Sequence, residues 1–305
     1  MTRIGVVGAG RVGAVLSAAL RAAGHDIVAA AGESTASRER IRTLLPGVPV
    51  MKPTDVARSS DLLLLTVPDD MLENVVISLV GAGVIRPGQY VVHTSGRHGL
   101  AALAAATGVG ARAIAMHPAM TFTGTEVDLD RLHGCVFGIT AGDADRALAE
   151  ALVGDLGGVP MFVPEDKRTL YHAGLAHGAN HLVTLVSQAM ELLAASGAED
   201  PAATLRPLLT AALDNALVAG DAALTGPIVR GDVNTVRAHL HDIGETAPGT
   251  IPSYVAMAKA TADRAVLDGR LLPFRAGKII RLLDEALARV EQPHLNRGQD
   301  RTEQR

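Results

Sequence analysis

The first half of the chain alternates short apolar runs with longer stretches in which apolar residues recur every three or four positions. This alternation predicts a doubly wound, parallel α/β sheet. The run at 61–67 is almost continuously apolar, as expected when helices cover both faces of a sheet. The predicted strands are 3–7, 25–31, 48–51, 61–67, 90–94, 111–116, 134–140 and 159–163, and the predicted helices are 12–23, 37–45, 69–80 (capped by Asp69 or Asp70), 100–106 and 143–156.

The pattern changes after Pro164, beyond which the sequence predicts helices alone. We therefore expect an α/β domain at 1–164, an all-helical substrate or dimerisation domain at 165–292, and a polar, disordered tail at 293–305. The predicted helices of the second domain are 165–196, 201–223, 232–241, 251–267 and 273–291.

A glycine-rich turn joins the first predicted strand to the first predicted helix. Residues 8–13 read Gly-Ala-Gly-Arg-Val-Gly, which between a strand and a helix is typical of dinucleotide-binding domains. Gly8 permits the tight turn, Gly10 leaves room for a pyrophosphate, and Gly13 lets the helix approach the strand. A glycine turn without a ligand is the alternative, but the strand–turn–helix context favours a dinucleotide site.

Composition narrows the class of protein. The 305 residues are 48% hydrophobic, carry a formal net charge of −4 and include no Trp, which argues against nucleic acid as the main partner. We expect no membrane-spanning segment, since no uninterrupted apolar run reaches about 18 residues. The chain enters a strand at once, so no signal peptide is expected. Its single cysteine, Cys135, fits a cytoplasmic location.

Several segments together resemble the 6-phosphogluconate dehydrogenase-like superfamily, which includes ketopantoate, pyrroline-5-carboxylate and prephenate-type enzymes. More closely, the chain is similar to the group that pairs a Rossmann-like domain with a helical domain long labelled as of unknown function. The resemblance implies a nicotinamide-dependent reductase, and some members of this group act as an alternative type of ketopantoate reductase. The segments that carry it are 67–70 (Val-Pro-Asp-Asp), 93–96 (His-Thr-Ser-Gly), 117–122 (His-Pro-Ala-Met-Thr-Phe), 166–180 and 224–228 (Leu-Thr-Gly-Pro-Ile).

Three predicted strands end in residues suited to a ligand site. Val67-Pro68 ends one strand, and the resemblance places this turn beside the cofactor ribose. Ser95 and His117 follow the next two strands, and prephenate-type dehydrogenases resemble this pattern of a Ser followed by a His-Pro. There the His bonds the substrate group that gains or loses the hydride. The alternatives are an ordinary strand-to-helix turn at Pro68 and a backbone-capping role for His117.

Lys167 opens the long helix at the start of the second domain. The chain uses only four Lys against 24 Arg, so a Lys is a notable choice here. A desolvated Lys can reach a near-neutral pKa and exchange a proton, whereas an Arg cannot. Ketopantoate reductases resemble this chain in using a Lys near this point to protonate the new alkoxide. A surface Lys at a helix start is the alternative.

The same helix carries His172 and Asn180, eight residues apart. They lie about 80° apart around a regular helix, among small residues, which suits the wall of a cleft. An Asn amide can both donate to and accept from a substrate carboxylate or hydroxyl. For His172, burial against a backbone partner is nearly as good an interpretation. We expect no metal site, because the histidines here lack a nearby carboxylate.

The loop after the second strand governs cofactor choice. An acidic residue there favours NAD, whereas Arg and Ser favour the 2′-phosphate of NADP. Residues 32–38 read Gly-Glu-Ser-Thr-Ala-Ser-Arg, so Glu33 competes with Ser34 and Arg38. We favour NADP(H), with NAD(H) as the alternative. The predicted cofactor-binding residues are Gly8, Gly10, Arg11, Val12, Gly13, Ser34, Arg38, Val67, Pro68 and Ser95.

We therefore predict an NAD(P)H-dependent oxidoreductase that reduces a small 2-oxo acid, with 2-dehydropantoate as the best single candidate. The alternatives are an imine or prephenate-like substrate, or a non-catalytic sensor of NADP(H). The Ala-rich helices favour a homodimer through the second domain, with no nucleic acid or membrane partner. The predicted catalytic residues are Lys167 as the acid, His117 polarising the carbonyl, Asn180 and His172 orienting the substrate, and Ser95 beside the nicotinamide.

Overall fold

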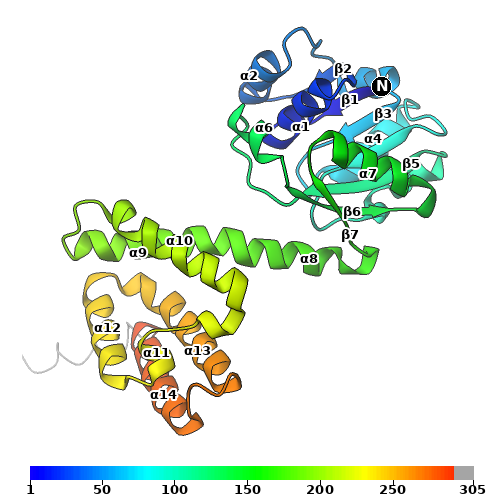
Figure 1. The fold of residues 1–305 in the computed structure, drawn as a ribbon. Coiled ribbons are helices and arrows are strands. Elements are labelled where there is room, and N and C mark those ends of the chain that lie inside the picture. The colour runs from blue at the N-terminus through cyan, green and yellow to red at the C-terminus, as the bar shows by residue number, and fades with distance from the viewer. Residues whose placement is uncertain (292–305) are drawn as a thin grey trace, which may run out of the picture. The chain divides into compact units, whose positions relative to one another are not determined.

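The computed structural model describes residues 1–291, so the tail expected at 293–305 lies outside the described residues. The chain divides into two compact units (Figure 1). The N-terminal unit is Met1–Asn180, and the C-terminal unit begins at His181. The boundary predicted at Pro164 lies before this division, because the residues from 165 to 180 group with the sheet of the N-terminal unit.

The N-terminal unit is built on one seven-stranded sheet with the order β2-β1-β3-β4-β5-β6-β7. All neighbouring strands are parallel except β5 and β6, which are antiparallel. The predicted all-parallel sheet is therefore wrong at this pair. The connection between the two strands contains only the short helix α6 (Val127–Arg131), whereas a parallel crossover is usually built on a longer α-helix. The strands are β1 (Arg3–Val7), β2 (Asp26–Ala31), β3 (Leu62–Leu65), β4 (Tyr90–His93), β5 (Arg112–Pro118), β6 (Val136–Ala141) and β7 (Val159–Phe162).

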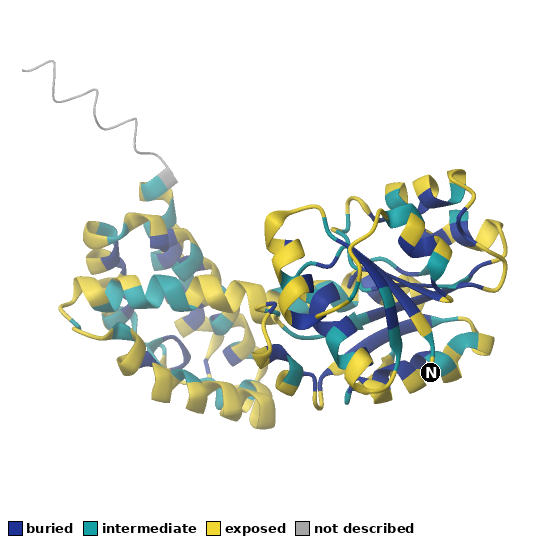
Figure 2. Cartoon of the chain, turned by 90° about the horizontal axis from the view of Figure 1, so that it is seen from above, coloured by how far each residue is buried: buried dark blue, intermediate teal, exposed yellow. Residues whose placement is uncertain are grey.

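Helices cover both faces of this sheet, as the apolar strands require. One face packs against α1 (Arg11–Ala22), α2 (Thr35–Leu44), α6 and α7 (Arg146–Asp155). The other packs against α3 (Pro53–Ser59), α4 (Leu72–Gly81), the short helix η1 (Leu100–Leu103) and α5 (Ala104–Gly108). The strands are mostly dark blue in Figure 2, which marks them as the core of the unit. Cys135 is buried just before β6.

Three local predictions for this unit need correction. The predicted strand at 48–51 is reduced to one isolated bridge between Ala30 and Val50. Neither Asp69 nor Asp70 caps α4, whose N-cap is Met71 without a side-chain hydrogen bond. The helix expected at 143–156 begins as a separate turn, η2 (Asp143–Asp145), before α7.

The helix predicted at 165–196 is interrupted. It begins as a turn, η3 (Glu165–Lys167), continues as α8 (Arg168–Leu175), widens into the π-helix η4 (Ala176–Asn180), and ends as α9 (His181–Ala195). π-Helical turns within α-helices are frequent at functional sites. The first two pieces and η4 belong to the N-terminal unit, and α9 opens the C-terminal unit.

The described part of the C-terminal unit is helical throughout, as predicted. Its buried cluster comes mainly from α11, α12, α13 and α14, and the helices from 251 and 273 have the predicted bounds. The helices after α9 are α10 (Pro201–Ala219), η5 (Gly220–Ala223), α11 (Pro227–Arg230), α12 (Val233–Thr246), η6 (Pro248–Thr250), α13 (Ile251–Leu267) and α14 (Pro273–Glu291).

Two apolar helices of this unit remain outside its core. α9 has no buried residue, and α10 has one, Leu205. The helical stretch Pro201–Arg230 is long and apolar enough to cross a membrane by length and composition alone, and its 18-residue window is 0% buried. The sequence analysis looked for an uninterrupted apolar run and did not identify this stretch, because Arg206 and Asp214 interrupt it.

Candidate functional site

A cleft of about 1330 Å³ opens at the carboxyl ends of β1 to β4. This edge is where ligands bind in open parallel sheets. The cleft is lined by the glycine turn, the loop after β2, the turn after β3 and the end of β4. Its lining includes the predicted cofactor residues Gly8, Gly10, Val12, Ser34, Arg38, Val67, Pro68 and Ser95.

The three glycines of the turn have separable roles. Gly8 has φ +92°, which side-chain-bearing residues rarely adopt. A Cβ on Gly13 would lie 2.2 Å from Thr66 Oγ1, so this glycine lets α1 approach the sheet. A Cβ on Gly10 would meet only Gly8 O, at 3.8 Å, and would otherwise fill open space. The turn therefore leaves a cradle at Gly10 that fits a pyrophosphate.

The loop after β2 presents both acidic and basic groups to the cleft. Ser34 caps α2 by accepting a hydrogen bond from Ser37 N at 3.0 Å. Arg38 Nε donates to Gly32 O at 3.4 Å, and its exposed guanidinium lines the cleft beside Glu33. This cap fixes the conformation of the loop at the edge of the cleft, where its side chains could bind a phosphate. Of the predicted residues, Arg11 and Gly13 do not line this cleft.

A buried histidine, His93, fixes the Ser95 loop through two hydrogen bonds. His93 Nε2 bonds Gly99 O at 2.9 Å, and Ser95 N donates to His93 Nδ1 at 3.1 Å. Burial lowers the pKa of His93 to about 4, so this ring is a neutral structural link. Ser95 Oγ accepts from His98 N at 3.1 Å, so its hydrogen remains available to a ligand.

Three aromatic rings lie close together beside the loop that carries Ser95. His117, at the end of β5, bonds Tyr171 Oη through Nδ1 at 3.0 Å. Its ring also lies edge-on to Tyr171 and His172, with centroids 5.7 Å and 5.8 Å away. Tyr171 and His172 both come from α8, so this helix brings two rings to the sheet edge. The structure thus unites the predicted residues Ser95, His117 and His172, and adds Tyr171, which the sequence analysis missed.

Two glycines make room for these rings. A Cβ on Gly138, the β6 residue paired with His117, would lie 2.6 Å from Tyr171 Oη. A Cβ on Gly96 would lie 2.4 Å from His172 Cδ2 and 3.0 Å from His117 Nε2. An isolated glycine inside a strand often marks such a close approach, so Gly138 was the sequence signal that could have pointed to this cluster.

Arg168 is the second residue that the sequence analysis missed, although it adjoins Lys167. Its side chain is fully buried, and it donates to Ser95 O at 2.6 Å, Gly138 O at 3.2 Å and Thr140 Oγ1 at 3.1 Å. It forms no ion pair among the described residues, and its Nε has no partner. Arg168 therefore ties the Ser95 loop to β6 and brings to the ring cluster a buried positive charge that has no ion-pair partner among the described residues.

This charge and the burial of the ring act on His117 in the same direction. Desolvation, and then the charge of Arg168, lower the pKa of His117 to about 4. Burial raises the pKa of Tyr171, which keeps its hydroxyl protonated. At neutral pH the pair is therefore an uncharged imidazole bonded to an uncharged phenol.

Two predicted catalytic residues lie outside the cluster. Lys167 Nζ pairs with Asp166 at 3.0 Å, and 62% of its side chain is exposed. The burial expected at this position falls instead on the next residue, Arg168. Asn180 is exposed at the end of η4, and the π-turn separates it from the regular helix that carries His172.

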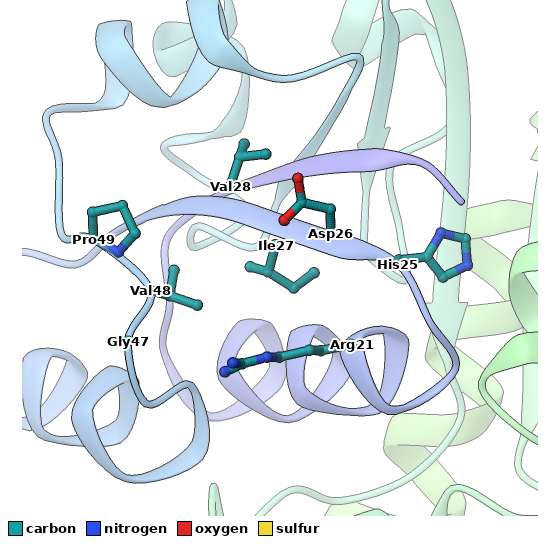
Figure 3. A pocket seen from close by; sticks show the side chains of 8 residues that line it. All are labelled: Arg21, His25, Asp26, Ile27, Val28, Gly47, Val48 and Pro49. Atoms are coloured by element: carbon teal, nitrogen blue, oxygen red, sulfur yellow. The ribbon is translucent and has the colours of Figure 1, made fainter.

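A smaller cavity of about 410 Å³ lies at the opposite end of β2 (Figure 3). Arg21 extends from α1 toward its loop and donates to Pro46 O at 2.8 Å, while His25 Nε2 bonds Asp155 at 2.9 Å. These polar groups link structural elements to one another. Because the cavity lies away from the carboxyl edge, the large cleft is the stronger candidate site.

Two separate segments of the sequence match two known domain families. Residues 1–118 match the Rossmann-like domain, and residues 135–261 match a domain of unknown function, DUF2520. No curated protein matches the chain.

Similar solved structures span most of the chain. A candidate NADP oxidoreductase from Bacteroides fragilis has a TM-score of 0.74 and 21% identity, covering 86% of this chain and 98% of its own. An imine reductase from Myxococcus stipitatus, solved with NADP⁺, has a TM-score of 0.58 and 19% identity, covering 94% of both chains. A pyrroline carboxylate reductase from Plasmodium falciparum, with NADP bound, has a TM-score of 0.54 and 10% identity, covering 92% and 98%.

At these identities the similarity establishes the fold. The predicted fold class is confirmed: a Rossmann-like α/β domain followed by a helical region.

Proposed function

We propose that this protein is an NADP(H)-dependent oxidoreductase that acts on a small oxo acid or a related substrate. The observation that carries the proposal is the continuity of the cleft from the open cradle at Gly10 to Ser95, where the ring cluster begins. A dinucleotide and a reacting group need such an arrangement, with phosphates at one end and polar donors at the other. Two structures with the same fold, the imine reductase and the pyrroline carboxylate reductase, were solved with NADP bound, which supports the choice of cofactor.

The residues of the cleft suit the parts of this cofactor. Backbone N–H groups at the start of α1 would hold the pyrophosphate beside Gly10, and Ser34 and Arg38 would hold the 2′-phosphate. Val67 and Pro68 provide an apolar wall between that loop and Ser95. When bound, the nicotinamide supplies a hydride, and the rest of the chemistry belongs to the protein.

For the substrate, we propose a 2-oxo acid, with 2-dehydropantoate as the first candidate. Arg168 gives the cluster a positive charge that favours an anionic substrate, while His117 and Ser95 can donate hydrogen bonds to a carbonyl oxygen. Lys167 and Asn180 remain predicted contributors to proton transfer and substrate orientation. A cyclic imine or a prephenate-like acid would use the same donors.

The first test is cofactor binding. Gly10→Val places a branched side chain in the cradle, so we expect NADPH to bind at least about tenfold more weakly while the fold persists. Fluorescence titration of NADPH gives the Kd. Gly154→Val is the matched control, because a Cβ there meets nothing within 4 Å, and Gly154 lies in α7 away from the cleft. Equal Kd values for folded Gly10→Val and the parent would disprove the dinucleotide site.

The second test separates an enzyme from a sensor. NADPH oxidation is followed with 2-dehydropantoate, then with other branched 2-oxo acids, cyclic imines and prephenate. An enzyme should turn over one of these classes, and Lys167→Ala should lower kcat if Lys167 is the acid. Tight binding of NADPH without turnover of any class would favour the sensor.

We also propose that the protein is a homodimer through its C-terminal unit. The exposed apolar residues of α9 and α10 include Leu182, Val183, Leu185, Leu208, Leu213, Leu217 and Val218, with exposed fractions between 40% and 89%. Monomeric proteins rarely leave so many large apolar side chains on neighbouring helices in water. A second copy carries the same uncovered face, so pairing two copies would bury both.

A further inference from the structure

We propose that Tyr171 and His117 form a proton path that ends at the reacting oxygen of the substrate. Tyr171 Oη passes its proton to His117 Nδ1 as His117 Nε2 passes its own to the substrate. This inference rests on the proposed reductase function, because only a reduction creates an alkoxide that needs a proton at this place. It assigns the immediate proton donor to His117, in place of Lys167, and the source of that proton to Tyr171.

The geometry of the pair carries the proposal. His117 Nδ1 and Tyr171 Oη lie 3.0 Å apart, a normal hydrogen-bond distance. Nε2, on the other side of the imidazole, has no bond to any group among the described residues. Nε2 is not one of the fully buried polar atoms that lack a partner, so it is accessible to solvent, and a Cβ on Gly96 would crowd it at 3.0 Å. One nitrogen therefore faces the tyrosine, and the other is available to a ligand.

The surroundings of His117 determine how it can act. Besides Tyr171, its charged or titratable neighbours are Arg168, His172, Asp69 and His93, and of these four only Asp69 favours the protonated ring. Asp69 is itself paired with Arg97 at 3.8 Å. An imidazolium is therefore disfavoured at neutral pH, and His117 cannot serve as a stored acid. A neutral imidazole can still deliver a proton from Nε2 if it receives another at Nδ1.

Tyr171 is placed to supply that proton. Its ring passes over Gly138, and the Arg168 guanidinium carbon lies 6.0 Å from the ring centroid. The buried cation would stabilise the phenolate that forms when the hydroxyl gives up its proton. Arg168 thus has two effects on the pair: it disfavours the imidazolium and favours the phenolate. It acts as a positioning residue, whereas His117 touches the substrate.

The step balances as follows. The hydride from the nicotinamide forms a C–H bond at the carbonyl carbon, and the carbonyl oxygen becomes an alkoxide. The Nε2–H bond of His117 breaks as an O–H bond forms on the product. The Tyr171 O–H bond breaks as an Nδ1–H bond forms, and His117 stays neutral throughout. Before the next turnover a proton from water adds at Nε2 and the Nδ1 proton returns to the phenolate, which restores the Nε2–H tautomer of His117 and the Tyr171 hydroxyl.

The first experiment detects the tautomer of His117 without any substrate. Long-range ¹H–¹⁵N spectra of the labelled full-length protein are recorded from about pH 5.5 to about pH 8, and His117→Asn assigns the signals. We expect one neutral tautomer with the proton on Nε2 across this range. In Tyr171→Phe, which keeps the ring but removes the hydroxyl, both tautomers should appear. A proton on Nδ1 in the parent protein would overturn the proposal.

The second experiment measures turnover. Tyr171→Phe should lower kcat by about tenfold or more, and should change KM and the Kd of NADPH by less than about twofold. Tyr254→Phe is a matched control, because Tyr254 Oη bonds His239 Nδ1 at the same 3.0 Å in the C-terminal unit. It should retain the parental kcat.

The outcomes separate this proposal from the proposed function. If Gly10→Val leaves NADPH binding unchanged, the cofactor site is wrong whatever the tautomer. If the parent turns over a substrate and Tyr171→Phe retains kcat within about twofold, the reductase stands and the proton path fails. If no substrate is turned over, the tautomer in the parent and in Tyr171→Phe still decides whether the pair is arranged to deliver a proton.

Discussion

The two units bury their apolar residues to different extents. In the N-terminal unit, β3 is buried at all four positions, and helices close both faces of the sheet. In the C-terminal unit, α11 to α14 enclose a cluster of their own, while the apolar helices α9 and α10 contribute almost nothing to it. Figure 2 shows this contrast as blue strands against yellow helices.

The contrast shows that apolar content alone does not indicate where a core lies. β3 and α10 are both apolar in sequence, but strands on both sides hold β3 in place, whereas α10 presents Leu217 and Val218 with 78% and 89% of their surfaces exposed. Burying such surfaces gives about 25 cal/mol per Å², so an uncovered pair of helices has a large driving force for association. We therefore expect the N-terminal unit to be complete within one chain and the C-terminal unit to require a second.

The largest predicted effect breaks this association. Replacing Leu213 and Leu217 with Glu would place two carboxylates in the proposed interface, where an unpaired charge costs several kcal/mol. We expect the parent to sediment as a dimer and the double variant to dissociate with a Kd about a thousandfold higher. Analytical ultracentrifugation over a range of concentrations measures both.

Val127→Glu is the control, because Val127 is 56% exposed on α6 of the N-terminal unit. It should leave the dimer intact. A parent that sediments as a monomer at all concentrations would contradict the proposal. Binding of that monomer to lipid vesicles would instead identify a membrane as the partner of Pro201–Arg230.

The next prediction places an acid-sensitive step in the N-terminal unit. His93 and His117 both have pKa values of about 4 in the folded protein, against 6.5 for an unperturbed His. Between these values the unfolded chain binds more protons than the folded one, so stability falls as pH decreases from about 6.5 to about 4. The buried His93 alone corresponds to roughly 3 kcal/mol.

Chemical denaturation at several pH values, read by hydrogen exchange in each unit, measures this loss. His93→Gln should be less stable than the parent at neutral pH but should lose less on acidification. An equal acid sensitivity in parent and variant would show that His93 is not responsible. A loss confined to the C-terminal unit would reverse the comparison between the units.

A smaller effect tests how tightly the ring cluster is packed. Gly138→Ala forces Tyr171 away from β6, because the new Cβ would lie 2.6 Å from the ring. Overpacking of this kind costs about 1–3 kcal/mol. Gly142→Ala is the control, since its Cβ would be 3.9 Å from the nearest atom, Asp145 Oδ2. In a Tyr171→Ala background, Gly138→Ala should cost much less than in the parent if the contact is the cause.

The smallest predicted effect concerns the loop after β2. Arg38→Ala should weaken NADPH by about tenfold, roughly 1.4 kcal/mol, and leave NADH almost unchanged, because only NADPH carries the 2′-phosphate. Arg42→Ala is the control on the same helix, where Arg42 pairs with Glu39 and does not line the cleft. Tighter binding of NADH than NADPH by the parent would show that Glu33 decides the cofactor.

Local sequence signals predicted the fold well, and most of the residues predicted to bind the cofactor line a single cleft. The glycine turn is one example: its conformation depends on residues 8–13 and their immediate strand and helix. The helices beginning at Ile251 and Pro273 are another, because proline and the periodic apolar residues fix their limits locally. The antiparallel β6 was missed, since strand direction depends on how the connection from β5 folds.

The ring cluster was only partly predictable, because its contacts join distant parts of the chain. Tyr171 and His117 are separated by 54 positions, and Arg168 and Ser95 by 73. Rarity of Lys directed attention to Lys167, but α8 begins at Arg168, and this single step determines which side chain is buried. Gly96 and Gly138 were the sequence signals for this cluster, because the absence of a side chain at each position lets a ring from α8 approach.

Cys135 has a practical consequence for studying the two units. It is the only cysteine in the chain, it is buried, and burial raises the pKa of its thiol, so little thiolate exists at neutral pH. A thiol introduced at an exposed position would therefore react with a maleimide long before the native one. One such site on α10 and another on α6 would allow fluorescent or spin labels to be placed selectively, without first removing the native cysteine.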